Sequence, residues 1–128
     1  MISLYDKRIY MEYLKTGLII FVALEHFYFL FLEMFLWTKP RTMKTFGIRD
    51  MQLAEDTKVL AANQGLYNGF LSVGLIVSLI FNEENVSILF LSFVLVAGIY
   101  GALSTKNSKL FIVQGIPALI ALSVIFLT

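Results

Sequence analysis

Four long stretches of the chain carry few charged side chains, and short polar segments separate them. They cover about residues 17–37, 58–81, 86–104 and 110–128, and they are interrupted by a segment containing Pro40 and Gly47 and by the turns NEEN and TKNSK. A helix of about 20 apolar residues can cross the hydrocarbon core of a bilayer, and short turns favour antiparallel neighbours. The pattern predicts an all-α fold, with residues 1–128 forming a single membrane domain of four antiparallel transmembrane helices.

The first 15 residues, MISLYDKRIYMEYLK, mix charged and apolar side chains and are less hydrophobic than the four spans. A segment of this composition can form a helix that lies in the membrane interface. It can equally form a solvated tail. The pattern leaves both alternatives open for residues 1–15.

Composition supports a membrane protein and excludes several other classes. Hydrophobic residues make up 59% of the chain and the mean hydropathy is +0.81, whereas soluble domains contain about 45 to 50% apolar residues. The net charge of +1 gives no broad basic surface for nucleic acid. The chain has no cysteine, which excludes disulfides and thiolate metal sites. The expected partner is therefore the lipid bilayer, and nucleic acid is not expected.

The distribution of lysine and arginine predicts how the chain is oriented in the cell membrane. The first and third connecting segments carry seven basic residues, the N-terminal segment carries three and the NEEN turn carries none. Basic segments remain on the cytoplasmic side. We therefore expect a multi-pass protein of the cell membrane with both termini outside.

Polar side chains that lie inside the spans are the candidates for function. The first span holds Glu25, His26 and Glu33, and an ionisable side chain at membrane depth costs roughly 2.5 to 3.5 kcal/mol. Counted from the cytoplasmic ends, polar residues of all four spans lie at similar depths. The pattern predicts one polar cavity in the cytoplasmic half, with binding or proton-exchange candidates Glu25, His26, Glu33, Asn63, Gln64, Tyr67, Asn68, Tyr100 and Gln114.

The same residues do not form a metal-binding pattern. His26 and Glu33 share a helix face but lie about 10.5 Å apart along the axis, too far apart to bind one ion together. The nearby amides and phenols are poor ligands for zinc or iron. We expect no metal and no cofactor, and we expect Glu33 or Glu25 to be protonated during part of the working cycle. For the amides, simple adhesion between helices is an equal alternative.

Two segments resemble a known family. They contain the motifs EH-x6-EMFLW, over residues 25–37, and NQGLYNGF, over residues 63–70. In these motifs the chain resembles the small integral membrane proteins grouped as domain of unknown function 1304, whereas its last two spans are similar to that family only as generic apolar segments. The resemblance implies a four-helix membrane protein and implies no particular activity.

Three classes of function fit this sequence. The favoured one is binding or transport of a small ligand, a cation or a proton through the Glu/His/Asn/Tyr cavity. A membrane-embedded enzyme that uses His26 with Glu33 or Glu25 as acid and base is the first alternative, although no catalytic motif identifies catalytic residues. A structural or partner-binding subunit is the second. Because 128 residues are few for a transporter, a homo-oligomer is also considered.

Overall fold

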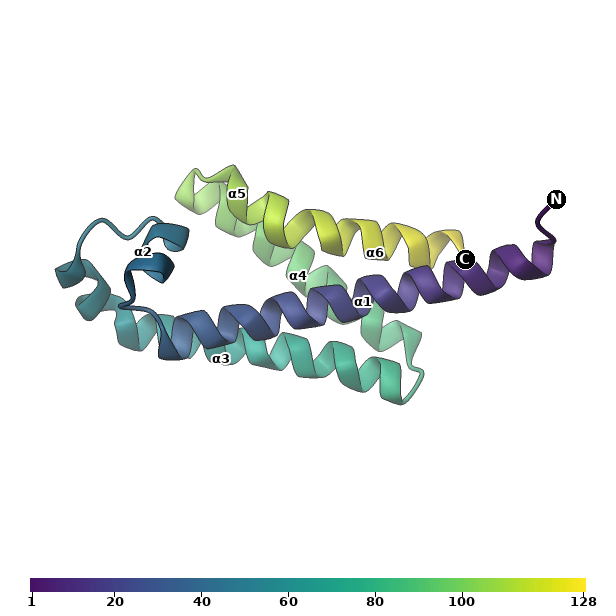
Figure 1. The fold of residues 1–128 in the computed structure, drawn as a ribbon, viewed down its shortest axis with the longest axis horizontal. Helices are drawn as coiled ribbons and strands as arrows, with labels where there is room; N and C mark the ends of the chain where they lie inside the picture. The colour runs from purple at the N-terminus through teal and green to yellow at the C-terminus, as the bar shows by residue number, and fades with distance from the viewer.

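The chain folds entirely into helices joined by short turns (Figure 1). A computed structural model describes all of residues 1–128. The all-α prediction is therefore confirmed. The elements are α1 (Leu4–Phe35), α2 (Pro40–Phe46), α3 (Met51–Ile80), α4 (Glu84–Thr105), α5 (Ser108–Leu110), the π-helical turn η1 (Phe111–Gly115) and α6 (Ile116–Leu127).

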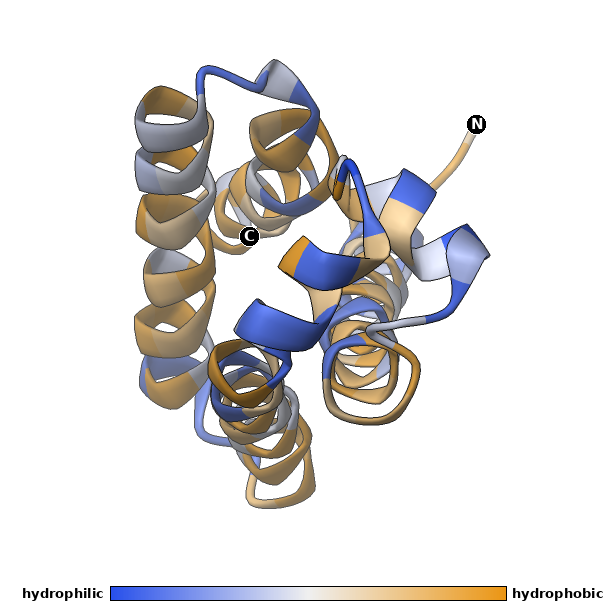
Figure 2. Ribbon diagram, turned by 90° about the vertical axis from the view of Figure 1, so that its left-hand side faces the viewer, coloured by the Kyte–Doolittle hydropathy of each residue, from blue (hydrophilic) through white to orange (hydrophobic).

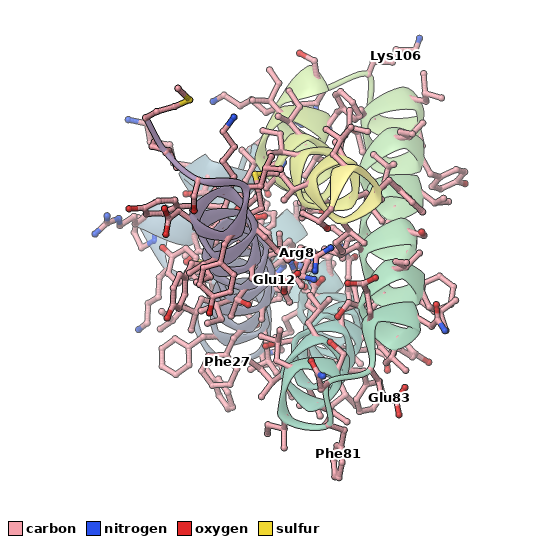
Figure 3. All side chains as sticks on the ribbon, turned by 90° about the vertical axis from the view of Figure 1, so that its right-hand side faces the viewer. Arg8, Glu12, Phe27, Phe81, Glu83 and Lys106 are labelled. Carbon is pink, nitrogen blue, oxygen red and sulfur yellow. The ribbon has the colours of Figure 1, made fainter.

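Three helical segments are long and apolar enough to cross a membrane: α1, α4 and the continuous segment Ser108–Leu127. The chain is therefore a multi-pass membrane protein. With 30 residues, α3 is also long enough, but amides, serines and glycines lower its hydropathy, so its crossing remains a prediction. Phe27 and Phe81 point outward from the bundle (Figure 3) and are 55% and 69% exposed, as expected of side chains that contact lipid.

The long helices pack as a ring around an apolar core. α1 contacts α3 and α6, and α4 contacts α3, η1 and α6. The core cluster lies toward the end that carries the C-terminus and the turn between α3 and α4. At the opposite end, polar residues gather on α2 and on the turns beside it (Figure 2). The core residues are Ile19, Val22, Ala23, Leu75, Leu91, Val94, Ala118, Ala121, Leu122 and Ile125.

Helix boundaries differ from the sequence prediction at the N-terminus. Residues 4–15 form neither a separate interfacial helix nor a tail, because α1 runs without a break from Leu4 into the first span. A capping box explains this start. Ser3 Oγ accepts from the Asp6 amide at 3.1 Å, and Asp6 Oδ2 accepts from the Ser3 amide at 3.2 Å, which satisfies free amide groups of the first turn.

Pro40 and Asp50 set the boundaries of the segment after α1. Pro40 occupies the first turn of α2, where its missing amide hydrogen costs nothing, so it begins a helix instead of only ending one. Asp50 Oδ1 accepts from the Leu53 amide at 2.8 Å and caps α3. α3 consequently begins at Met51, about two helical turns before the predicted start at residue 58.

The last helix contains a π-helical turn in front of Pro117. The Ile116 amide donates to the Phe111 carbonyl, five residues earlier. Proline has no amide hydrogen and its ring crowds the preceding turn, and a wider turn relieves that crowding. Gly98 of α4 packs directly on this turn, since a Cβ placed on Gly98 would lie 3.0 Å from the Gly115 nitrogen.

Candidate functional site

Glu33 and Asn68 form a buried hydrogen bond between α1 and α3. Asn68 Nδ2 donates to Glu33 Oε2 at 3.0 Å, and the two residues are only 2% and 9% exposed. The other carboxylate oxygen, Oε1, makes no hydrogen bond within the protein. A buried acidic side chain is thus held in a fixed position by one of its oxygens, which leaves the second available to another group.

Two glycines bring α3 close enough to α1 for this bond. Gly65 and Gly69 lie on either side of Asn68 in the sequence GLYNG. A Cβ on Gly65 would lie 3.0 Å from Glu33 Cβ and 3.1 Å from the Leu30 carbonyl oxygen. Small residues four positions apart let two helices approach closely in lipid. The close approach and the hydrogen bond therefore belong to one contact between the helices.

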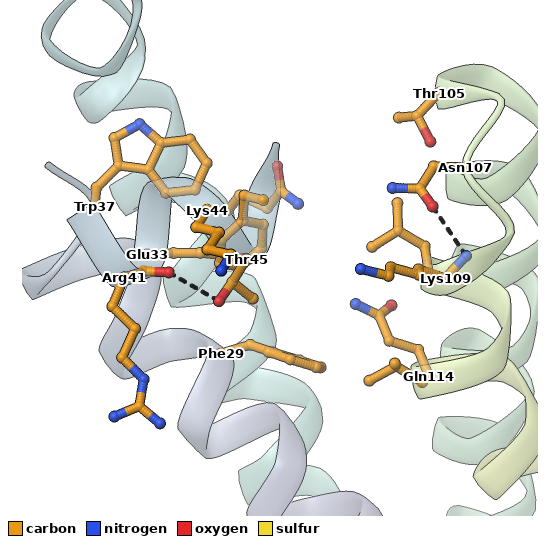
Figure 4. Close-up of a pocket in the computed structure, with 14 residues that line it drawn as sticks. Phe29, Glu33, Trp37, Arg41, Lys44, Thr45, Thr105, Asn107, Lys109 and Gln114 are labelled. Carbon is orange, nitrogen blue, oxygen red and sulfur yellow. Dashed lines mark hydrogen bonds between the residues drawn. The ribbon is translucent and has the colours of Figure 1, made fainter. Parts of the chain in front are cut away.

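A cavity of about 730 Å³ lies next to Glu33 at the α2 end of the bundle. One wall comes from α1, α2 and α3, and the other from the end of α4, α5 and η1 (Figure 4). Its volume is within the range of about 300 to 1,000 Å³ found for small-molecule sites. The lining residues are Phe29, Glu33, Trp37, Arg41, Lys44, Thr45, Phe46, Gln64, Thr105, Asn107, Lys109, Leu110, Val113 and Gln114.

Trp37 holds α2 in place as part of the first wall. Its indole Nε1–H donates to Thr57 Oγ1 of α3 at 3.0 Å, and its ring packs against Phe46 with centroids 5.1 Å apart. α2 ends at Gly47, whose positive φ of 68° suits glycine. These contacts place the basic residues of α2 beside the cavity instead of leaving them on a free loop.

The second wall begins where α4 ends. Lys106 adopts a left-handed conformation with φ 54°, and Asn107 Oδ1 then accepts from the Lys109 amide at 3.0 Å. This cap starts α5 in a direction that brings Lys109 and Gln114 to the cavity, as Figure 4 shows. The turn after α4 is therefore a part of the site.

The cavity lining carries more positive than negative charge. Three of its side chains are basic, Arg41, Lys44 and Lys109, and Glu33 is the one acidic side chain. None of the three basic groups forms a salt bridge, because the ion pairs of the structure join Lys15 to Glu12 and Glu84, and Lys58 to Glu55. The basic groups are therefore free to bind a ligand.

Glu33 also borders a second, smaller cavity. This space measures about 370 Å³ and lies along α1 and α3, lined by Glu33, Met34, Phe35, Trp37, Thr38, Lys58, Val59 and Ala62. Glu33 and Trp37 line both cavities. The carboxylate thus stands between two spaces at the same end of the bundle.

His26 lies deeper and forms part of the packed interior. It is 1% exposed, its Nδ1–H donates to the Val22 carbonyl at 2.9 Å, and it packs edge-on against Phe29 at 5.5 Å. Glu25 is half-buried, and its Oε1 is buried without a partner. Neither lines the large cavity, although Phe29 connects His26 to its wall. No three His, Cys, Asp or Glu side chains gather as a metal site.

The remaining predicted residues divide by helix face. Gln64 and Gln114 line the cavity and Asn68 binds Glu33. Asn63 is exposed, and Tyr67 and Tyr100 are 59% and 72% exposed outside the cavity. These three residues were predicted from their depth. Successive residues of a helix point about 100° apart, so residues at nearly the same depth can face different sides of the helix. Their side chains therefore do not reach the cavity.

Most residues of the cavity lining were not predicted from the sequence. From the sequence, Arg41, Lys44 and Lys109 were counted only among the charges that orient the chain, because the position of α2 beside the cavity depends on the Trp37 contacts. Pro40 followed by a short run ending at Gly47 is a signal for a short helix, and it could have indicated that these charges are held in place.

Comparisons with known proteins agree with the resemblance found in the sequence. A family model described as "Protein of unknown function (DUF1304)" matches residues 20–126. The chain is 35% identical over 115 residues to the uncharacterized protein YpaA of Lactococcus lactis subsp. lactis (strain IL1403), an alignment that covers 88% of this chain and 96% of that protein. No solved structure matches the chain. The family match and the extent of the alignment establish that the chain belongs to the DUF1304 family.

Proposed function

We propose that this membrane protein binds a small ligand in the cavity between α1–α2 and α5–η1. The observation that supports the proposal is Glu33: a buried carboxylate, fixed by Asn68 through one oxygen, that presents its other oxygen beside a cavity of about 730 Å³. An ionisable group at membrane depth is energetically costly, and its presence there indicates a functional site. A ligand-binding site gives that group a use.

The proposed arrangement in the membrane has four crossings, with α3 as the fourth, and both termini outside. In this arrangement the basic segment around α2 and the turn TKNSK lie on the cytoplasmic side, as the positive-inside rule expects. The cavity then opens near the cytoplasmic surface. Asn68 of α3 binds Glu33 of α1 and Gln64 lines the cavity, which accounts for part of the lower hydropathy of α3.

The binding function is favoured over the enzyme by the placement of the candidate acid and base. His26 uses Nδ1 for the Val22 carbonyl and is packed against Phe29, and it does not line the cavity that Glu33 lines. A general acid and base must both reach the reacting atoms. Of the predicted acid and base only Glu33 lines the cavity, so binding is the simpler function for these residues.

A cavity-filling substitution tests the proposal. Val113→Phe adds bulk inside the cavity, whereas Ile112→Phe adds the same ring at a neighbouring exposed position that does not line it. Native mass spectrometry of the purified proteins should detect a retained small molecule with the wild type and with Ile112→Phe, and should lose it with Val113→Phe. Equal retention by both variants, or no retained molecule in any of them, would refute binding in this cavity.

A further inference from the structure

The two walls of the large cavity each contribute basic side chains. Arg41 and Lys44 come from α2, and Lys109 comes from α5. In Figure 4, Lys44 lies on one wall and Lys109 extends from the opposite wall toward it. None of the three is paired with a carboxylate. Like charges repel, so an arrangement that brings them to one space favours an anion between them.

Five further residues of the lining are apolar. Phe29, Trp37, Phe46, Leu110 and Val113 form surfaces on both walls of the same space. An ion alone would use the basic groups but leave these surfaces in contact with water. A purely apolar molecule would cover the surfaces but leave the charges without partners. A ligand with both properties satisfies the basic and the apolar parts of the lining together.

We propose that the ligand is an anionic amphiphile, with a phosphate or carboxylate headgroup between Lys44 and Lys109 and an apolar tail along Phe29, Leu110 and Val113. This inference rests on the proposed binding function and names its ligand class. Charged donors bind phosphate and carboxylate strongly, and Arg41 adds a fork of donors suited to both. Glu33 Oε1 accepts from a hydroxyl or amine of the same ligand.

The basic lining is distinct from the general positive charge of this end. Lys39, Arg49 and Lys106 lie in the same connecting segments and are exposed, yet none of them lines the cavity. All six residues contribute equally to the charge that orients the chain in the membrane. Only Arg41, Lys44 and Lys109 are positioned to bind the headgroup, so the two groups can be separated by substitution.

Trp37 provides a direct readout of binding. It is the one tryptophan of the chain and it lines the cavity, so its emission reports a ligand that enters there. The protein is placed in nanodiscs of phosphatidylcholine and titrated with oleoyl lysophosphatidate. Two further titrations use mono-oleoylglycerol, which has the tail without the anion, and inorganic phosphate, which has the anion without the tail.

Lysophosphatidate should change the Trp37 emission saturably and bind more tightly than either reference compound. The double variant Lys44→Gln/Lys109→Gln should bind it about tenfold or more weakly, because two charge-assisted hydrogen bonds are lost. The control variant Lys39→Gln/Lys106→Gln has the same net charge and should bind as the wild type does. Raising NaCl from 0.05 to 0.5 M should weaken binding to the wild type through screening, a result that needs no variant.

Each alternative outcome is distinct. Equal affinity for mono-oleoylglycerol and lysophosphatidate would overturn the anionic headgroup but leave binding in the cavity intact. Equal affinity for inorganic phosphate would replace the amphiphile by a free anion. Equal weakening in the two double variants would assign the effect to overall charge and overturn the role of Lys44 and Lys109. If none of the three compounds changes the emission, the ligand class fails, and the retained-molecule experiment with Val113→Phe decides the binding function separately.

Discussion

Three glycines provide a graded test of the contact between α1 and α3. Replacing any helical glycine by alanine favours the helix by about 1 kcal/mol. The cost of the added methyl group differs among Gly17, Gly69 and Gly65. At Gly17 the methyl meets nothing within 4 Å. Gly17→Ala should therefore retain the full gain in stability.

The other two positions contact Leu30. At Gly69 the methyl meets the end of the Leu30 side chain, whose Cγ is already 3.7 Å away, so a rotamer change costing about 0.5 to 1.5 kcal/mol suffices. At Gly65 it meets the Leu30 carbonyl oxygen at 3.1 Å and Glu33 Cβ at 3.0 Å. These atoms cannot rotate away, so α3 must shift, and overpacking costs about 1 to 3 kcal/mol.

We expect Gly17→Ala to be the most stable of the three variants, Gly69→Ala to be intermediate and Gly65→Ala to be the least stable. The first and last should differ by about 2 kcal/mol when gain and cost are combined. At about 4 °C per kcal/mol for a chain of this size, their melting temperatures should differ by roughly 8 °C. Thermal unfolding in detergent, followed by Trp37 emission, measures this difference. A Gly65→Ala protein as stable as Gly17→Ala would refute the close contact between α1 and α3.

Two further predictions concern Glu33 and the orientation of the chain. Glu33→Gln keeps an oxygen for Asn68 and removes a charge that is costly to bury, so its melting temperature should equal or exceed that of the wild type; a lower value would mean that the charge itself stabilises the fold. Glu33→Leu leaves the Asn68 amide without its partner and should be less stable than the wild type by about 1 to 3 kcal/mol; equal stability would refute the contribution of this hydrogen bond. In intact cells, an impermeant thiol reagent should label Glu83→Cys but not Arg49→Cys, both exposed positions, and the reverse pattern would place the cavity on the outer side.

Mean hydropathy and length were sufficient to identify α1, α4 and the segment 108–127 as spans, because each contains a long apolar stretch with few charged side chains. The full length of α1 could not be predicted in this way. Its first turns are exposed and charged, and a local cap at Ser3 and Asp6 starts the helix. Caps of this kind can be recognised in a sequence, whereas hydropathy alone does not reveal them.

The candidate site was only partly accessible from the sequence. Glu33, Gln64, Asn68 and Gln114 were selected because polar groups are rare inside spans, and the structure places all four at or beside the cavity. Tyr67 was selected on depth and points elsewhere. The basic lining depends on contacts that are distant in sequence, such as Trp37 with Thr57, and such contacts follow from tertiary packing.

The π-helical turn before Pro117 determines which residues of the continuous helical segment Ser108–Leu127 face the cavity. A π-turn is an α-helix with one inserted residue, and each inserted residue shifts the helical phase by about 100°. Lys109 and Leu110 precede the insertion and line the cavity, whereas Ala118 and Ala121 follow it and lie in the core. In a regular helix through this region the two sets would lose this relative rotation. One inserted residue thus allows a single helical segment to pack in the core near its C-terminal end and to line the cavity near its N-terminal end.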